Sequence, residues 1–140
     1  MKILNKKAGF NYTIEEKVEA GIVLTGGEAR AIRTGHINLS NSYAKILDHE
    51  VFLINADVAV AGAKGYDPTH MRKLLLNRRE IVNLETKIKQ NKLTLVPTKV
   101  YTKRRLIKVE LGLAKSKREF EKKQTMKERD IKRDLDRELK

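Results

Sequence analysis

The chain has 140 residues, of which 35% are charged, and a formal net charge of +13. Its apolar runs are all much shorter than the roughly 20 residues that span a bilayer, and no apolar stretch follows the lysines near Met1. We therefore expect a cytoplasmic protein with neither a membrane span nor a secretory signal, and the absence of cysteine excludes disulfides and thiolate chemistry.

A strand and a short helix are predicted in the first quarter of the chain. Apolar and polar residues alternate from residue 10, and the strand continues to the apolar run that ends at Leu24. Thr25 and Glu28 have the spacing of a capping box, in which each side chain bonds the backbone amide of the other. We expect the helix to cover residues 26–33, and Gly35 suits the left-handed position just past its end.

A β-hairpin is predicted in the middle of the chain. Residues 42–47 and 50–55 have the composition of strands, and Asp48-His49 lies between them. Asp tolerates turn geometry, but no glycine stands at this turn, so its type stays open. Residues 56–65 are rich in small side chains and are assigned to no element.

Another strand and a second capped helix follow. Residues 72–76 suit a strand or the start of a helix, and we prefer the strand because a separate helix start follows at Asn77. Asn77 and Glu80 repeat the capping pattern, so a helix is expected over residues 78–90, with Asn91 as its end.

The last two predicted strands form a hairpin over residues 93–102 and 107–113. Pro97 requires an edge or a bulge in the first of them. In the second, apolar and polar residues alternate, which places Lys108 on the solvent face. Five or six strands with two or three short helices predict a mainly β fold: a closed or partly closed antiparallel barrel of the oligonucleotide-binding type.

The chain divides into a compact domain, residues 1–114, and a C-terminal tail, residues 115–140. The tail has no Gly or Pro and holds 11 Lys/Arg against seven Asp/Glu. Its few apolar residues cannot offset a backbone ordering cost of about 1–2 kcal/mol per residue. Because most of its residues favour helix, with Ile131, Leu135 and Leu139 on one stripe, we expect a tail that is disordered when free and helical on a partner.

The residues do not predict catalysis. The three histidines are scattered, and none has metal-ligand spacing to another. Thr25-Gly26-Gly27 lacks the Lys-Ser/Thr of a phosphate-binding loop and suits a helix entry instead. A nuclease would need a clustered acidic or histidine site. We therefore expect a binding protein that is not an enzyme and has no metal or cofactor.

The charge points to a phosphate-rich partner, because Lys and Arg that neutralise phosphates release condensed counterions. With few aromatic residues available for base stacking, we favour recognition of the shape and backbone of a folded RNA. The alternative is a basic protein with no nucleic-acid role. The basic groups are Lys6/Lys7, Arg30/Arg33, Arg72/Lys73, Arg78/Arg79 and Lys103/Arg104/Arg105/Lys108.

Seven segments, in order and covering nearly the whole chain, resemble the SmpB family of bacterial SsrA-binding proteins. The resemblance implies a closed oligonucleotide-binding-like barrel with flanking helices and a tail that is disordered in isolation. It also implies a function: an adaptor of trans-translation that binds the tRNA-like domain of transfer-messenger RNA and brings it to stalled ribosomes, where the tail folds in the empty message channel. The segments are residues 5–8, 19–26, 41–43, 67–68, 72–80, 108–110 and 113–115.

Matching motif to motif, the resemblance implies RNA-binding positions at Glu19, Leu75, Asn77 and Lys108, with Tyr43 and Lys73 as neighbours. The residues themselves also predict a capping role for Asn77 and a core position for Leu75, which would make both supports of the RNA surface. A carboxylate at Glu19 suits base amino groups, 2′-hydroxyls or a neighbouring basic side chain better than it suits phosphate.

The resemblance further implies a ribosome-binding role for the tail. Ser116, Glu121 and Lys123 depart from the family pattern, and Lys in place of Arg loses a planar fork that suits RNA. Gly9 departs likewise at a position that is usually basic. The implied ribosome-binding residues are Lys117, Arg118, Phe120, Lys122, Lys123, Lys127, Arg129, Lys132 and Arg133.

The expected partners are thus transfer-messenger RNA and the ribosomal RNA of the stalled ribosome, with no membrane, and the free protein is expected to be a monomer. The main alternative is a ribosomal protein that binds ribosomal RNA permanently. That class also predicts a basic barrel with an extended tail, and tight binding of a free pool to isolated tRNA-like RNA would separate the two.

Overall fold

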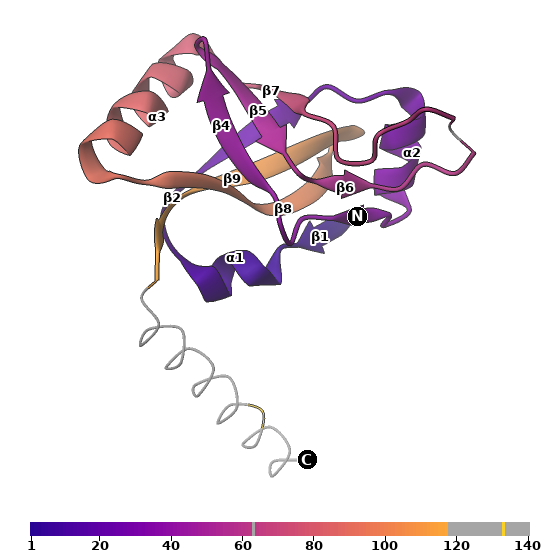
Figure 1. The fold of residues 1–140 in the computed structure, drawn as a ribbon, viewed down its shortest axis with the longest axis horizontal. Helices are drawn as coiled ribbons and strands as arrows, with labels where there is room; N and C mark the ends of the chain where they lie inside the picture. The colour runs from indigo at the N-terminus through magenta and orange to yellow at the C-terminus, as the bar shows by residue number, and fades with distance from the viewer. Residues whose placement is uncertain (63, 118–132, 134–140) are drawn as a thin grey trace.

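The computed structural model describes residues 1–62, 64–117 and 133 (Figure 1). Strands dominate it, and three helices flank them in the described part of the chain. The elements are β1 (Lys2–Leu4), α1 (Lys6–Asn11), β2 (Tyr12–Ile22), α2 (Gly26–Arg33), β3 (Ile37–Asn38), β4 (Tyr43–Leu47), β5 (Glu50–Ile54), β6 (Asp57–Val58), β7 (Arg72–Leu75), α3 (Arg78–Asn91), β8 (Thr94–Lys103) and β9 (Leu106–Ser116).

One large antiparallel sheet organises the fold, in the strand order β1-β8-β4-β5-β7-β2-β9. β9 also pairs with β8, so the pairings run from β8 through β4, β5, β7, β2 and β9 back to β8. The β4–β8 connection is the narrowest, with Ala44 opposite Leu95 as its one partner pair. β3 and β6 form a separate two-stranded sheet. The prediction of a mainly β fold with short flanking helices is confirmed.

The strands bury alternate side chains in a main apolar core. On β7, Arg72 is 1% exposed and Leu74 is buried, whereas Leu75 is 52% exposed. The prediction that Leu75 lies in the core is therefore wrong, because the side-chain period of two sends it to the face opposite Leu74. The fully buried apolar side chains include Ile32, Val51, Leu53, Val58, Val109 and Leu111.

Both predicted capping boxes are confirmed. The Glu28 amide donates to Thr25 Oγ1 at 3.2 Å, and the Thr25 amide donates to Glu28 Oε1 at 3.0 Å. Asn77 and Glu80 form the same reciprocal pair at the start of α3. Gly35 has φ of +86°, as expected past the end of α2. These features depend on residues three or four positions apart, which explains why the sequence reveals them.

Two tight turns join consecutive strands. Asp48 and His49, between β4 and β5, have φ of 49° and 63°, and Arg104 and Arg105, between β8 and β9, have φ of 51° and 68°. Positive φ at both central residues identifies type I′ turns, which match the twist of the flanking strands. The hairpin predicted over residues 42–55 is thus confirmed, and its turn type is decided.

The N-terminal region differs from the prediction. Residues 10 and 11 belong to α1, and β2 begins only at Tyr12, where pairing with Ser116 becomes available. Ala8 of α1 is buried against Val96 and Ala114, a contact with the far end of the chain that short-range periodicity cannot reveal. β1, which pairs with β8, was also not predicted.

The end of the sheet lies beyond the predicted boundary at residue 114. β9 continues to Ser116, and the amide of Lys117 donates to the carbonyl of Asn11 at 2.9 Å. Pro97 coincides with a register shift between β8 and β9, which agrees with the bulge, one of the two alternatives predicted for this proline.

Candidate nucleic-acid interface

Four of the predicted RNA-binding residues lie on adjacent strands of the sheet. Gly21 of β2 is opposite Lys108 of β9 on one side and Leu75 of β7 on the other. Glu19 and Lys73 lie two residues from Gly21 and Leu75 on the same outward face, but at its opposite ends, because β2 and β7 are antiparallel. Neighbouring strands are about 4.8 Å apart and residues rise about 3.3 Å along a strand, so these positions fall within roughly 15 Å, which one RNA segment can span. We call this surface, formed by Glu19, Gly21, Lys73, Leu75 and Lys108, the β9–β2–β7 face.

Gly21 lets Leu75 pack closely at the centre of the β9–β2–β7 face. A Cβ atom at this position would lie 3.2 Å from the Cβ of Leu75, which is tighter than ordinary contact. The Leu75 side chain therefore packs over the backbone of Gly21, and its outer part stays exposed on the face. The sequence interpretation did not foresee this close packing between Gly21 and Leu75. The available signal was a glycine inside a strand, which often marks a close approach of another segment or a ligand.

Glu19 is held in the ionised form by its neighbours on the same face. The Tyr101 hydroxyl donates to Glu19 Oε2, and Lys103 Nζ lies 3.5 Å from Oε1. The hydrogen bond from Tyr101, with the charges of Lys103 and Lys108, keeps the pKa of Glu19 below its usual value against partial desolvation. Burial, with the bond to Glu19, raises the pKa of Tyr101. The carboxylate therefore orients Lys103, in line with one of the roles predicted for it.

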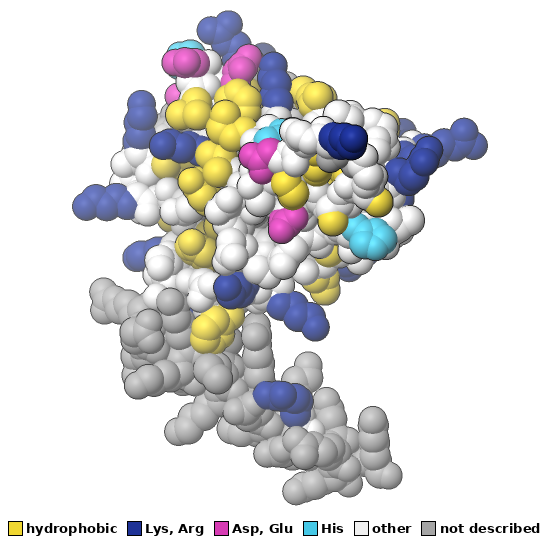
Figure 2. All heavy atoms as spheres, turned by 45° about the vertical axis from the view of Figure 1, so that its right-hand side comes forward, with side chains coloured by type: hydrophobic (Ala, Val, Ile, Leu, Met, Phe, Trp, Pro, Cys, Tyr) yellow, Lys and Arg dark blue, Asp and Glu magenta, His cyan; other side chains and the backbone are white. Residues whose placement is uncertain are grey.

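Lys108 keeps its charge available for an anion. The nearby carboxylate of Glu110 is already paired, with Lys99 at 3.4 Å and Lys17 at 3.6 Å. Across the residues that the structure describes, no carboxylate lies within 4.0 Å of the Lys108 ammonium group. Figure 2 shows that lysine and arginine side chains project around the rim of the folded body, with few acidic ones between them.

The other predicted residues occupy different positions. Lys73 is exposed and pairs with Glu50 at 3.2 Å. Asn77 uses its Oδ1 to accept from the Glu80 amide at 2.9 Å, and nothing in the described part of the chain accepts from its Nδ2. Asn77 can therefore cap α3 and still donate to a ligand. Tyr43 is exposed on β4, separated from β7 by β5, and lines a groove between β4 and α3.

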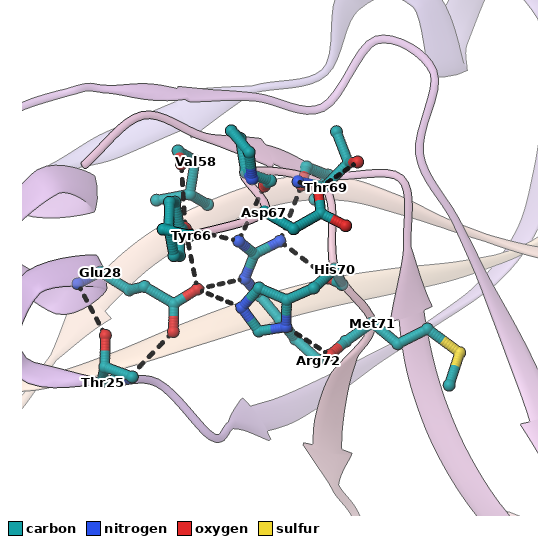
Figure 3. Close-up of polar contacts among 11 residues, drawn as sticks. Thr25, Glu28, Val58, Tyr66, Asp67, Thr69, His70, Met71 and Arg72 are labelled. Carbon is teal, nitrogen blue, oxygen red and sulfur yellow. Dashed lines mark hydrogen bonds and ion pairs between the residues drawn. The ribbon is translucent and has the colours of Figure 1, made fainter. Parts of the chain in front are cut away.

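Arg72, which the sequence places among the basic groups that meet phosphate, is buried and unavailable. Its Nε donates to Glu28 Oε2 at 2.7 Å, and its Nη2 donates to the Tyr66 hydroxyl at 2.9 Å (Figure 3). His70 Nε2 lies 2.9 Å from the same Glu28 oxygen. That prediction is wrong because β7 alternates, so Arg72 turns inward while Lys73 turns outward. The remaining Arg72 bonds go to the carbonyls of Ala56, Pro68 and His70.

The buried Glu28–Arg72 pair fixes the loop that precedes β7. It ties α2 to residues 56–70 and so sets the position of the strand that presents Lys73 and Leu75. No group of three or more potential metal ligands occurs among residues 1–62, 64–117 and 133. The Glu28–Arg72 pair is thus a structural support of the β9–β2–β7 face.

We expect the stability of the protein to fall at low pH because of Glu28. Burial raises its pKa, but hydrogen bonds from the Thr25 amide, Arg72 and His70 outweigh this and lower the pKa from 4.5 to about 2. Because the pKa of Glu28 is lower in the folded state, this group adds about 3 kcal/mol to the free energy of unfolding. That stabilisation is present above pH 4.5 and is lost as pH falls towards 2. Urea unfolding between pH 7 and pH 2 should show a steeper loss for the wild type than for Glu28→Gln. Parallel acid profiles for the two proteins would contradict this.

Of the predicted tail residues, the structure describes Lys117 and Arg133. Lys117 Nζ donates to the Gly9 carbonyl at 3.0 Å, so this side chain contacts α1, and Arg133 is exposed. No helix in the described part of the chain is long and apolar enough to cross a membrane. The predicted residues outside the described ones are Arg118, Phe120, Lys122, Lys123, Lys127, Arg129 and Lys132.

Comparisons with known proteins agree with one another. The sequence model described as SmpB protein matches residues 2–140. An SsrA-binding protein of Desulfitobacterium hafniense is 46% identical over 136 residues, covering 95% of this chain and 87% of that protein. One from Chloroflexus aurantiacus is 47% identical over 140 residues, covering 97% and 88%. A chain in the solved structure "tmRNA-SmpB: a journey to the center of the bacterial ribosome" is 39% identical, with a TM-score of 0.69, and the match covers 84% of this chain and 85% of that one.

Proposed function

The chain belongs to the SmpB protein family, and from this premise we propose that it is an RNA-binding adaptor of trans-translation. It binds the tRNA-like domain of transfer-messenger RNA and delivers it to stalled ribosomes. The relatives are named for binding SsrA, and the similar solved chain comes from a structure of tmRNA and SmpB with the bacterial ribosome.

The observation that carries the proposal is the position of Glu19, Lys73, Leu75 and Lys108 around Gly21 on one face of the sheet. Each kind of group has a chemical counterpart in folded RNA. The ammonium groups meet phosphates, the Glu19 carboxylate accepts from 2′-hydroxyls or base amino groups, and the exposed Leu75 packs on sugars or bases. Most of these contacts read the shape and backbone of RNA, which suits a tRNA-like fold.

We further propose the shape of the barrel, the role of the tail and the place where the adaptor acts. The cycle of strand pairings supports a closed oligonucleotide-binding-like barrel, although one partner pair forms the β4–β8 connection. The tail beyond Lys117 is the ribosome-binding segment. The adaptor acts in the cytoplasm as a monomer until it binds RNA, and it has no catalytic role of its own.

The deciding experiment compares binding of the full chain and of residues 1–117 to the tRNA-like domain of transfer-messenger RNA. Excess generic duplex RNA competes at physiological salt. Tight, competitor-resistant binding by both proteins supports recognition by the folded body, residues 1–117. Equal, salt-sensitive binding to every RNA would instead favour a ribosomal protein that holds ribosomal RNA permanently.

Lys108→Glu is expected to weaken binding to the tRNA-like domain and to reduce the slope of log K against log salt by about one, because one phosphate contact is lost. Titrations at several salt concentrations measure both quantities. Lys64→Glu makes the same charge change in an exposed loop between β6 and β7 and serves as the control. An unchanged slope for Lys108→Glu removes this residue from the phosphate contacts.

A further inference from the structure

The turn between β8 and β9 is built from residues that do not suit it. Arg104 and Arg105 occupy the two central positions of a type I′ turn, with φ of 51° and 68°. Such turns strongly prefer Asn-Gly, Asp-Gly or Gly-Gly, because both positions are left-handed. A long side chain in this region is uncommon, and residues in unfavourable backbone conformations gather at functional sites. The turn therefore carries two arginines at a cost to its own conformation.

A second pair of arginines lies beside this turn. Arg33, at the end of α2, donates from Nη2 to the carbonyl of Arg105 at 2.8 Å, so the helix end and the hairpin end are in contact (Figure 1). Arg30 is one turn earlier on α2. We call Arg30, Arg33, Arg104 and Arg105 the arginine cluster.

The arginine cluster is exposed, and its charge is not compensated locally. All four residues are exposed, and across the described residues no carboxylate lies within 4.0 Å of any of their guanidinium groups. Arg33 spends one N–H donor on the Arg105 carbonyl and keeps the others. Basic side chains in the last turn of a helix favour the helix dipole, which explains Arg30 and Arg33 but not the turn residues.

We propose that the arginine cluster is a second contact site for the sugar–phosphate backbone of double-helical RNA, beyond the β9–β2–β7 face. One guanidinium group can bind two phosphate oxygens at once. Four guanidinium groups at one end of the molecule therefore suit successive phosphates of a nucleic acid better than a single small anion. Lys108 and Arg105 lie on one hairpin, three residues or about 10 Å apart, so one RNA helix can contact both surfaces. The inference rests on the proposed function only in taking RNA as the partner.

The test uses the turn chemistry itself. In the full chain, Arg104→Asn with Arg105→Gly removes both guanidinium groups and supplies the residues that a type I′ turn prefers. The variant should resist urea at least as well as the wild type, so a loss of binding cannot come from misfolding. Its affinity for RNA should fall about ten- to thirtyfold at physiological salt, and the salt slope should fall by about two.

A matched control exists in the same protein. Asp48→Asn with His49→Gly makes the same change at the type I′ turn between β4 and β5, which carries no arginine. This control should bind RNA as tightly as the wild type. Arg30→Gln, which leaves the Arg33–Arg105 contact intact, should lower the slope by about one.

Two binding arms identify the RNA. One uses the isolated tRNA-like domain of transfer-messenger RNA, and the other measures binding of the preformed protein–RNA complex to ribosomes. A loss in the first arm assigns the cluster to the tRNA-like domain, and a loss confined to the second assigns it to ribosomal RNA. Unchanged affinity and slope in both arms overturn the inference. Failure of the wild-type chain to bind in either arm would instead count against the proposed function.

Discussion

Removing residues 118–140 is expected to abolish ribosome rescue while leaving affinity for the tRNA-like domain largely unchanged. All residues of the β9–β2–β7 face lie before this cut, and within residues 64–117 the bonds of Lys117 to Asn11 and Gly9 come last in the chain. The removed segment contains most of the basic residues assigned to the ribosome. Peptide tagging in a cell-free reaction on a message without a stop codon measures rescue, and titration with the tRNA-like domain measures affinity.

The cut must follow Lys117. A shorter protein that ends at residue 114 is the informative comparison, because it removes the partners of Tyr12 and Thr13 at the start of β2. It should unfold at a lower urea concentration than residues 1–117. If the protein that ends at Lys117 also loses affinity for the tRNA-like domain, the division between an RNA-binding body and a ribosome-binding tail is wrong.

Arg72→Met is expected to destabilise the fold by about 3–5 kcal/mol, because it leaves the buried Glu28 carboxylate without its cationic partner. This is a large fraction of the 5–15 kcal/mol of stability that is typical of a domain. Adding Glu28→Gln should recover at least about 1 kcal/mol, since the unpaired charge is then removed. Urea unfolding at neutral pH measures all three variants, and strictly additive losses would contradict the coupling.

Lys73→Met provides the matched control for Arg72→Met. It removes a cation from the adjacent position of the same strand, but Lys73 and its partner Glu50 are exposed, so stability should change little. The effects of the two variants on RNA binding should be the opposite of their effects on stability. Where both variants remain folded, Lys73→Met should reduce the salt slope of RNA binding, and Arg72→Met should leave it unchanged. If both variants had the same salt slope, the outward Lys73 would not differ from the inward Arg72 in its contribution to RNA binding.

Much of the molecule follows from short-range patterns. The capping boxes at Thr25 and Asn77, the hairpin over residues 42–55 and the outward direction of Lys108 each depend on neighbours within a few positions. The ordered motifs also identify the family, which the comparisons confirm. The direction of two side chains, inward or outward, was predicted wrongly, and both residues lie on β7. Leu75 was placed inside and Arg72 outside, because a strand that combines arginine with leucine does not reveal which face is buried.

The sequence by itself determined the fold class, the family and the candidate RNA-binding residues, because periodicity, capping and motif order are local properties of the chain. Only the tertiary structure decided which of those residues share a face. Glu19 meets Tyr101 across 82 positions and Arg33 meets Arg105 across 72, and such contacts are set by strand pairing between distant segments. Hydrogen bonding between strands fixes register, and register decides whether a side chain faces the core or a partner.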